Sequence, residues 1–307
     1  MSSEKQTWSS KGKLLITGEY LVMEGALSLA LPLRVGQSLS LKKNNSKILH
    51  WQANKTDGSW FTAEYELPSL NIKSADDAAL SQKLKKILTV AKEMSGDFLA
   101  DNFGFDVTTL LEFNPEFGLG SSSTLINNIA RWANINPYHL LQNTFGGSGF
   151  DIACARSNNP ILFQVVHGDN HVTNVNFNPP EKDRLYFIYL GKKQSSSDSI
   201  SAFKKHGKFT SKDIDSISDI TEDLILTNNL TEFEKLLTEH ERIMAIVLKL
   251  PTAKSLYFND YPGVVKSLGA WGGDFVLVTN HDFEINLRSY MKSKGFDTIF
   301  RYDGLVL

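Results

Sequence analysis

The segment Pro115-Glu116-Phe117-Gly118-Leu119-Gly120-Ser121-Ser122-Ser123-Thr124 carries the strongest structural signal in this sequence. It lies between an alternating apolar stretch, Phe103 to Phe113, which predicts a strand, and a stretch of helical periodicity, Ser122 to Ile135. Its glycines allow a tight turn, and its serines open the helix, where free N–H groups and the helix dipole favour an anion. We therefore predict a phosphate-binding loop; the alternative is a loop that only caps a helix.

The spelling of this loop excludes three better-known glycine motifs. A Walker A loop ends in Gly-Lys followed by Ser or Thr, and no lysine stands in the segment. A dinucleotide fingerprint requires a third glycine where Ser123 stands. A nucleophile elbow requires Gly-x-Ser-x-Gly, which neither Gly120–Thr124 nor Gly146–Phe150 matches. A phosphate bound here would be held by backbone N–H groups and serine hydroxyls.

Length and composition indicate a globular protein without a dominant charge. The chain has 307 residues, of which 41% are hydrophobic and 21% are charged, and its net charge is -2. That balance supports one large or two ordinary domains, and it excludes nucleic-acid binding through a basic excess. The polar start of the chain and the lack of an apolar run of roughly 20 residues lead us to expect a soluble, cytoplasmic protein that contacts no membrane.

Cysteine and histidine content argue against two kinds of site. Cys154 is the only cysteine, and its apolar neighbours predict a small buried residue rather than a nucleophile. The seven histidines show no metal-ligand spacing, so we expect no zinc site built from them.

The periodicity of the remaining chain predicts strands and helices that do not alternate strictly. A strand and a turn are expected at 13–23, and strands are expected at 27–41 (as a hairpin), 50–67 (with a turn at Gly58), 185–190, 264–279 (two strands and a loop) and 297–307. Helices are expected at 76–95 with Ser74 or Asp76 as cap, from Asn136-Pro137 onwards, across 213–247, and at 283–294 with Asp282 as cap. The proline-bearing joint at 178–181 predicts a boundary. This order favours an α+β protein of two lobes, 1–180 and 181–307.

Five segments together are similar to the motifs of one enzyme family. They are Gly12-Lys13-Leu14-Leu15-Ile16-Thr17-Gly18-Glu19-Tyr20, Pro115 to Ser123, Gly147-Ser148-Gly149-Phe150-Asp151-Ile152-Ala153, Gly191-Lys192-Lys193-Gln194-Ser195-Ser196 and Lys266-Ser267-Leu268-Gly269-Ala270-Trp271-Gly272-Gly273-Asp274. In this order they resemble the motifs of the GHMP kinases, most closely those of the mevalonate and phosphomevalonate kinases. The matches span residues 12 to 274, which is nearly the whole chain.

The resemblance implies an N-terminal α/β lobe that binds ATP, a C-terminal ferredoxin-like lobe, and an active site between them that uses ATP and Mg²⁺. It implies Asp151 as general base, with Lys13 beside it and the γ-phosphate. The implied phosphate-binding residues are Gly118, Leu119, Gly120, Ser121, Ser122 and Ser123, with Ser122, or Ser121, on the metal. The implied substrate-binding residues are Ser148, Gly149, Lys192, Ser195, Ser196, Gly269, Ala270, Trp271, Gly272 and Gly273.

Some features depart from that family or allow a plainer interpretation. Trp271 stands where family members commonly have glycine, and no acid stands in Tyr138–Asn143, where mevalonate kinases carry a metal-binding glutamate. Mg²⁺ would then be held with fewer protein ligands or by an acid from elsewhere in the chain. Asp151 also fits a helix N-cap, Lys13 fits a surface lysine, and 269–273 fits a bend between strands.

The resemblance leads us to predict an ATP-dependent kinase that phosphorylates mevalonate or phosphomevalonate. The alternatives are a sugar or other small-alcohol kinase of the same family, a diphosphomevalonate decarboxylase, and a binding or regulatory protein that kept the fold without turnover. Lys13 and Asp151 argue against the last, because binding alone needs no base. The expected partner is a small-molecule substrate. The sequence does not decide whether the chain forms a homodimer.

Overall fold

The computed structural model describes residues 5–100, 103–192 and 196–307. Two compact units form within this range, and each is assembled from separate stretches of sequence. Unit 1 comprises the chain up to Gly12, Val35–Pro115 and Leu119–Arg156, and unit 2 comprises Lys13–Arg34, Glu116–Gly118 and Ser157–Leu307. The expected division into 1–180 and 181–307 stays a prediction.

A mixed sheet forms the framework of unit 1. Its strands are β1 (Gln6–Leu15), β2 (Ser28–Asn44), β3 (Ile48–Lys55), β4 (Gly58–Glu66), β5 (Asn71–Ala75) and β6 (Gly104–Leu111). The strand order is β5-β4-β3-β6-β2, and β1 also pairs with β2. The N-terminal part of β2 pairs with β7 (Ile161–Val166), which in turn pairs with β8 (Asp169–Asn174), and both of these strands belong to unit 2. Strands β2 and β6 run antiparallel, with Gln37 opposite Leu111, whereas β3 and β6 run parallel, with Leu49 opposite Phe105.

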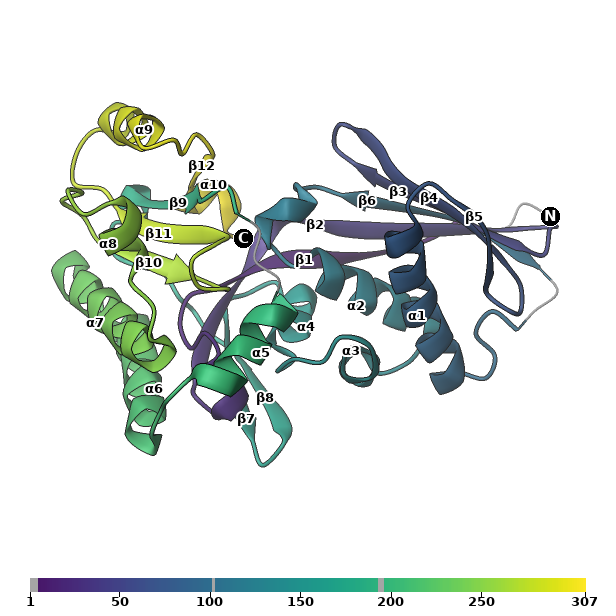
Figure 1. Ribbon diagram of the computed structural model, residues 1–307, viewed down its shortest axis with the longest axis horizontal. Coiled ribbons are helices and arrows are strands. Elements are labelled where there is room, and N and C mark those ends of the chain that lie inside the picture. Colours follow the sequence, from purple (N-terminus) through teal and green to yellow (C-terminus); the bar gives the residue numbers. More distant parts are fainter. Residues whose placement is uncertain (1–4, 101–102, 193–195) are drawn as a thin grey trace. The chain divides into compact units, whose positions relative to one another are not determined.

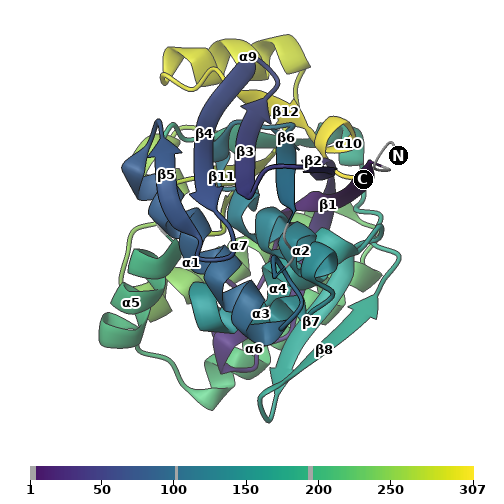
Figure 2. The ribbon, with the colours of Figure 1, turned by 90° about the vertical axis from the view of Figure 1, so that its right-hand side faces the viewer.

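Helices cover one side of this sheet. They are α1 (Ala78–Met94), α2 (Ser121–Ala133), α3 (Pro137–Thr144) and α4 (Phe150–Arg156). Figure 2 shows α1, α2 and α3 on the same side of β3, β4 and β6. The apolar stripe of α1 and the inward positions of the strands share one core, in which Tyr65, Leu88 and Ile126 are fully buried. This packing fixes the position of α2 and therefore of the serines that open it.

Unit 2 is built around a four-stranded antiparallel sheet (Figure 1). Its order is β10 (Val265–Leu268), β11 (Phe275–Thr279), β9 (Leu185–Tyr189) and β12 (Ile299–Arg301). The helices are α5 (Ser196–His206), α6 (Ser211–Leu226), α7 (Leu230–Leu248), α8 (Ala253–Tyr257), α9 (Glu284–Ser293) and α10 (Tyr302–Leu305). Short helical turns occur at η1 (Leu21–Glu24), η2 (Pro115–Phe117) and η3 (Lys182–Arg184). Helices α7 and α8 pack against β10, so that strand lies under a helical layer.

The expected hairpin at 27–41 is wrong, because β2 is one continuous strand of 17 residues. Ser28–Ala30 pair with β7, and Gln37–Asn44 pair with β6. Pro32 and Gly36 lie between these two pairings, where the strand changes partners. A proline that cannot donate to a ladder is tolerated at such a position, so it does not mark a turn here.

Three smaller expectations also fail at element ends. The last strand stops at Arg301, and the chain then turns into α10. Asp77, not Ser74 or Asp76, caps α1 by accepting from Leu80 N–H, because the carboxylate of Asp76 is used by Thr62 on β4. Phe283, not Asp282, is the N-cap position of α9. The Asn136-Pro137 start of α3 is confirmed.

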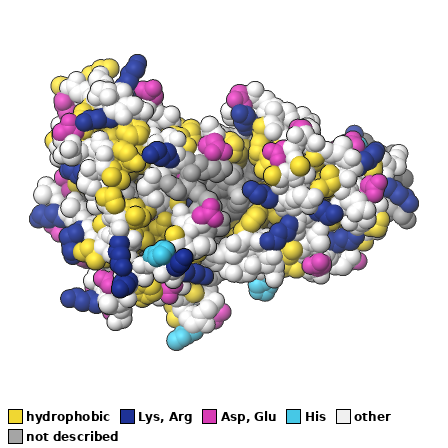
Figure 3. Space-filling model, viewed as in Figure 1, with side chains coloured by type: hydrophobic (Ala, Val, Ile, Leu, Met, Phe, Trp, Pro, Cys, Tyr) yellow, Lys and Arg dark blue, Asp and Glu magenta, His cyan; other side chains and the backbone are white. Residues whose placement is uncertain are grey.

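The exposed side chains carry charges of both signs. Figure 3 shows Lys and Arg interspersed with Asp and Glu on the face in view. None of the helices in the described part of the chain has the length and apolar character needed to cross a membrane.

The predicted α+β class is confirmed, with an eight-stranded sheet and a separate four-stranded antiparallel sheet.

Candidate functional site

The N-terminus of α2 has the geometry of an anion-binding site. Gly120 is its N-cap, with φ of 96°, and the first helical hydrogen bond runs from Thr124 N–H to Gly120 O at 3.0 Å. The N–H groups of Ser121, Ser122 and Ser123 have no hydrogen-bond partner among the described residues. Ser123 donates its hydroxyl to Gly120 O, whereas Ser122 is exposed. Three N–H donors and the positive end of a helix dipole are therefore open to a phosphate.

Asp151 lies in the first turn of α4, which packs against α2. The carbonyl of Gly149 accepts from Ile152 and Ala153, and the hydroxyl of Ser148 accepts from Phe150 N–H. These groups start the helix, so Asp151 is not its N-cap. The half-buried carboxylate is thus held on an element in contact with the helix that the serines open.

Glycines before α4 adopt backbone conformations that other residues rarely reach. Gly146, Gly147 and Gly149 have φ of 71°, 107° and 94°. A Cβ at Gly146 or Gly147 would meet no atom within 4 Å, so these two positions line open space. Cys154, on the buried side of α4, is fully buried as predicted.

The first half of the phosphate loop is anchored in unit 2 by an aromatic residue. The ring of Phe117 packs against Tyr189, Phe275 and Phe300, on three strands of the four-stranded sheet, with centroid distances of 4.8 to 5.9 Å. The Tyr189 hydroxyl donates to Glu116 O at 3.0 Å. These contacts determine where the loop begins.

Gly118, the next residue, is required by space as well as by conformation. Its φ is 68°, and a Cβ would overlap the carboxylate of Asp274. Any side chain here would displace that carboxylate from the loop.

The predicted strand–loop–strand at 264–279 is present as β10, the loop Gly269–Asp274 and β11. Gly269 and Gly272 have φ of 66° and 82°. Trp271 is buried, and its indole donates to Pro251 O at 3.0 Å. The indole is therefore held within unit 2, and its expected effect on substrate choice stays a prediction.

A cluster of charged side chains lies buried behind this loop. Lys266 on β10 donates to Glu19 Oε1 at 2.5 Å, and both side chains are almost completely inaccessible to solvent. His240 on α7 accepts from Gly18 N–H through Nε2 at 3.0 Å, so a neutral ring carries its proton on Nδ1. Glu19 Oε2 lies 3.4 Å from His240 Nε2 and has no hydrogen-bond partner among the described residues.

A second carboxylate completes the cluster. Glu241, next to His240 on α7, accepts from Ser267 N–H at 3.0 Å and from Ser267 Oγ at 2.8 Å. The side chains of Lys266 and Glu241 thus hold β10 to the segment after β1 and to α7 respectively.

Burial dominates the ionisation of this cluster. It raises the pKa of Glu19 to about 7, although Lys266 opposes the shift. Burial also raises the pKa of Glu241, and burial with the charge of Lys266 lowers the pKa of His240 well below its ordinary value. At neutral pH His240 is uncharged, and the raised pKa of Glu19 favours its protonated form, which reduces the excess of buried negative charge.

The remaining predicted residues are more scattered. Lys13 lies half-buried in the part of β1 that belongs to unit 2, so its expected proximity to Asp151 of unit 1 stays a prediction. Lys192 is exposed, with its ammonium 5.8 Å from the ring of Tyr257. Ser195 and the side chain of Ser196 lie outside the described residues. Among those that are described, no three His, Cys, Asp or Glu side chains form a metal-binding group.

The buried cluster around Glu19 was not predicted from the sequence, although the sequence contains one signal for it. The apolar stripe of α7 includes Leu237, Met244 and Val247, and Glu241 falls on the same stripe. A charged residue on the apolar face of a helix predicts a buried partner. No comparable signal marked Asp274 or the anchoring role of Phe117.

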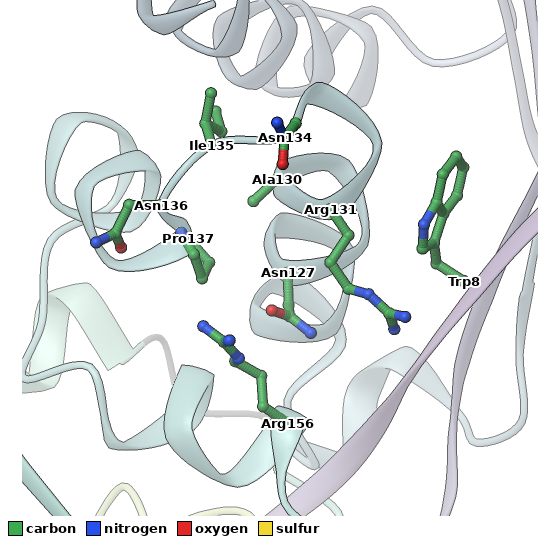
Figure 4. Close-up of a pocket in the computed structure, with 9 residues that line it drawn as sticks. All are labelled: Trp8, Asn127, Ala130, Arg131, Asn134, Ile135, Asn136, Pro137 and Arg156. Carbon is green, nitrogen blue, oxygen red and sulfur yellow. The ribbon is translucent and has the colours of Figure 1, made fainter.

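A separate cavity of about 410 Å³ opens at the other end of α2 (Figure 4). Its walls include Trp8, Asn127, Arg131 and Arg156. None of the residues predicted for the functional site lines it. The glycine and serine segments, not this cavity, therefore define the candidate site.

Comparison with known proteins gives structural matches only. No family model matches the chain, and neither does any curated protein sequence. L. major mevalonate kinase in complex with R-mevalonate matches with a TM-score of 0.72 and 15% identity, over 98% of this chain and 96% of that one. Streptococcus pneumoniae phosphomevalonate kinase in complex with phosphomevalonate and AMPPNP matches with a TM-score of 0.69 and 16% identity, over 96% of this chain and 99% of that one.

A sugar kinase has the same architecture. Lactococcus lactis galactokinase complexed with galactose matches with a TM-score of 0.68 and 13% identity, over 97% of this chain and 92% of that one. Identities this low establish the fold and not the substrate. The chain has the fold of the GHMP kinases, as the five sequence motifs predicted.

Proposed function

We propose that the chain is an ATP- and Mg²⁺-dependent kinase that phosphorylates a small alcohol or phosphate, with mevalonate or phosphomevalonate as the first substrates to test. The N-terminus of α2 carries this proposal. Three backbone N–H groups there, from Ser121 to Ser123, have no hydrogen-bond partner among the described residues. Such a helix end favours an anion such as a phosphate group, and the resemblance to the GHMP kinases leads us to propose the triphosphate of ATP.

The residues around the loop fit a nucleotide. Gly118 lets the loop pass close to the Asp274 carboxylate, and Gly120 takes the positive φ that lets the chain enter α2. The exposed hydroxyl of Ser122 is available to a Mg²⁺ ion, which usually keeps several waters and needs few protein ligands. The bound nucleotide would supply the phosphoryl group, and the ion would offset its charge.

With an alcohol as acceptor, Asp151 would accept the proton of the substrate hydroxyl as the phosphoryl group is transferred. It lies half-buried on a helix that packs against α2, in the same unit as the serines that open α2. Lys13 would favour the ionised form of this carboxylate if the two side chains are neighbours. The loop Gly269–Asp274 and Ser148 would contact the acceptor.

An ADP-release assay with ATP and Mg²⁺ tests the proposal directly. The acceptors are mevalonate, phosphomevalonate, galactose and homoserine, and the control reaction contains no acceptor. We expect turnover with mevalonate or phosphomevalonate. If galactose is the one acceptor that gives ADP release, the chain is a sugar kinase. No release with any acceptor, with ATP still bound in calorimetry, would favour a binding protein without turnover.

A further inference from the structure

Tyr20 has a backbone conformation that L-residues rarely adopt. Its φ is 61° and its ψ is -47°, and Leu21 N–H donates to Glu19 O at 2.7 Å across it. These values describe a γ-turn with positive φ, a rare and strained conformation. Such strain persists only where the surrounding structure holds the residue in place, and it is often found at functional sites.

The residues on both sides of the turn are fixed. Gly18 donates its N–H to His240 and packs so closely on Ser28 that a Cβ would overlap the Ser28 side chain. Glu19 is bonded to the buried ammonium of Lys266. The strained turn is therefore imposed by contacts with α7 and β10 and is not a local choice of the sequence.

The strain has a clear result, which is the position of one hydroxyl. The Tyr20 hydroxyl accepts from Trp271 N–H at 3.1 Å, in the middle of the loop Gly269–Asp274. The ring packs on Phe203 of α5, with centroids 5.3 Å apart. Burial raises the pKa of the Tyr20 hydroxyl above its ordinary value, so it stays neutral and available at physiological pH.

We infer that Tyr20 is a positioning residue, whose hydroxyl holds the loop Gly269–Asp274 in its observed conformation through Trp271 N–H. The positive φ of Gly269 and Gly272 gives the loop a conformation that depends on outside contacts, and the Tyr20 hydroxyl holds the amide that lies between these two glycines. The inference deepens the proposed function and rests on it only where the loop is said to contact the acceptor.

Amide hydrogen exchange of the variant Tyr20→Phe tests this inference without any activity. The substitution removes the hydroxyl and keeps the ring on Phe203. We expect the Trp271 amide to exchange about five- to tenfold faster than in the wild type, because one hydrogen bond is lost. Unchanged exchange at Trp271 would overturn the inference.

Tyr261→Phe is the matched control. Its hydroxyl also makes a buried hydrogen bond in unit 2, to Thr279 O at 2.8 Å, but does not touch the loop. We expect this variant to leave exchange at Trp271 unchanged while losing a comparable amount of stability. Equal acceleration in both variants would indicate general loosening and would overturn the specific role of Tyr20.

Steady-state kinetics separates this inference from the proposed function. If the loop contacts the acceptor, Tyr20→Phe should raise KM for the acceptor several-fold with little change in KM for ATP, and Tyr261→Phe should change neither. A wild type without turnover would end the proposed function, yet the exchange experiment would still decide whether Tyr20 holds the loop.

Discussion

The N-terminus of α2 in unit 1 and the cluster around Glu19 in unit 2 use polar groups in opposite ways. At α2, the N–H groups of Ser121 to Ser123 have no hydrogen-bond partner in the described part of the chain. In the cluster, Glu19 and Glu241 are buried and bonded to Lys266 and Ser267. An open donor can take a ligand without losing a protein bond, whereas a paired buried charge stabilises one conformation.

The difference shows that a motif is not uniform in its roles. The segment Gly12–Tyr20 resembles a kinase motif as a whole, yet Glu19 within it is almost completely buried and bonded to Lys266. The hydroxyl of its neighbour Tyr20 accepts a hydrogen bond from Trp271 N–H in the loop Gly269–Asp274. Substitutions at open groups should therefore change binding or turnover, and substitutions in the cluster should change stability.

Asp151→Asn, in the unit that contains the N-terminus of α2, should have the largest effect. Under the proposed function, the variant loses the base that accepts the substrate proton, and kcat should fall by about 10²- to 10⁴-fold. Binding of ATP, measured by calorimetry, should stay near the wild-type value. Asp106→Asn, an exposed carboxylate on β6 of the same unit, is the control and should keep kcat within about twofold. Near-normal turnover of Asp151→Asn would remove this residue from the role of base.

Gly118→Ala tests the close approach of Gly118 to Asp274, two residues that both belong to unit 2. The new Cβ would overlap the Asp274 carboxylate at a positive φ, so we expect a loss of about 2 kcal/mol of unfolding free energy. Urea denaturation measures this loss. Gly96→Ala is the control, because its Cβ would meet no atom within 4 Å. Equal stability of the two variants would mean that the Asp274 side chain moves away freely.

The sequence predicted the parts of the fold that depend on periodicity and on glycine. The apolar stripe of α1, the Asn136-Pro137 start of α3 and the two strands of 264–279 all depend on local patterns. The continuity of β2 could not be predicted, because Pro32 is tolerated only through the change of partner strand described above. Tertiary pairing decided the role of that proline.

Only the part of the candidate site that depends on a local sequence pattern could be predicted. The segment Gly118–Ser123 was identified from its glycines and serines, and the structure places the serines at the start of a helix. The partners of Glu19 could not be identified from the sequence, because Lys266 and His240 lie more than 200 residues away along the chain and only folding brings them together. The contacts of Asp274 with Gly118 have the same origin.

Glu19→Gln should change the pH dependence of stability by a smaller amount. The pKa of Glu19 is raised to about 7 from 4.5, so the folded state holds a proton that the unfolded state has released. The contribution of Glu19 is therefore complete at low pH and is lost as pH rises through about 7. The lowered pKa of His240 acts in the opposite direction, since its unfolded form binds a proton below its ordinary pKa.

Because Glu19 and His240 contribute opposite slopes to the pH dependence of stability, we compare the unfolding free energy of the variant with that of the wild type at each pH. Relative to the wild type, Glu19→Gln should gain about 1 kcal/mol of unfolding free energy between about pH 6 and about pH 8. Urea denaturation across this range measures it. Glu232→Gln, exposed on α7, is the control and should follow the wild type. A difference that does not vary with pH would show that Glu19 is not protonated in the folded state near neutrality.

Ser122→Ala should give the smallest effect, and it tests how far the open side depends on a hydroxyl rather than on backbone N–H groups. Removal of one Mg²⁺ ligand should raise the Mg²⁺ concentration for half-maximal turnover roughly threefold, since the ion replaces a lost hydroxyl with water. Ser123→Ala is the control, because its hydroxyl is already used by Gly120 O and should not reach the ion. If the titration of Ser122→Ala matches the wild type and that of Ser121→Ala shifts, the metal ligand is Ser121. If neither shifts, the open site works through its N–H groups alone, and the ion depends on an acid elsewhere in the chain.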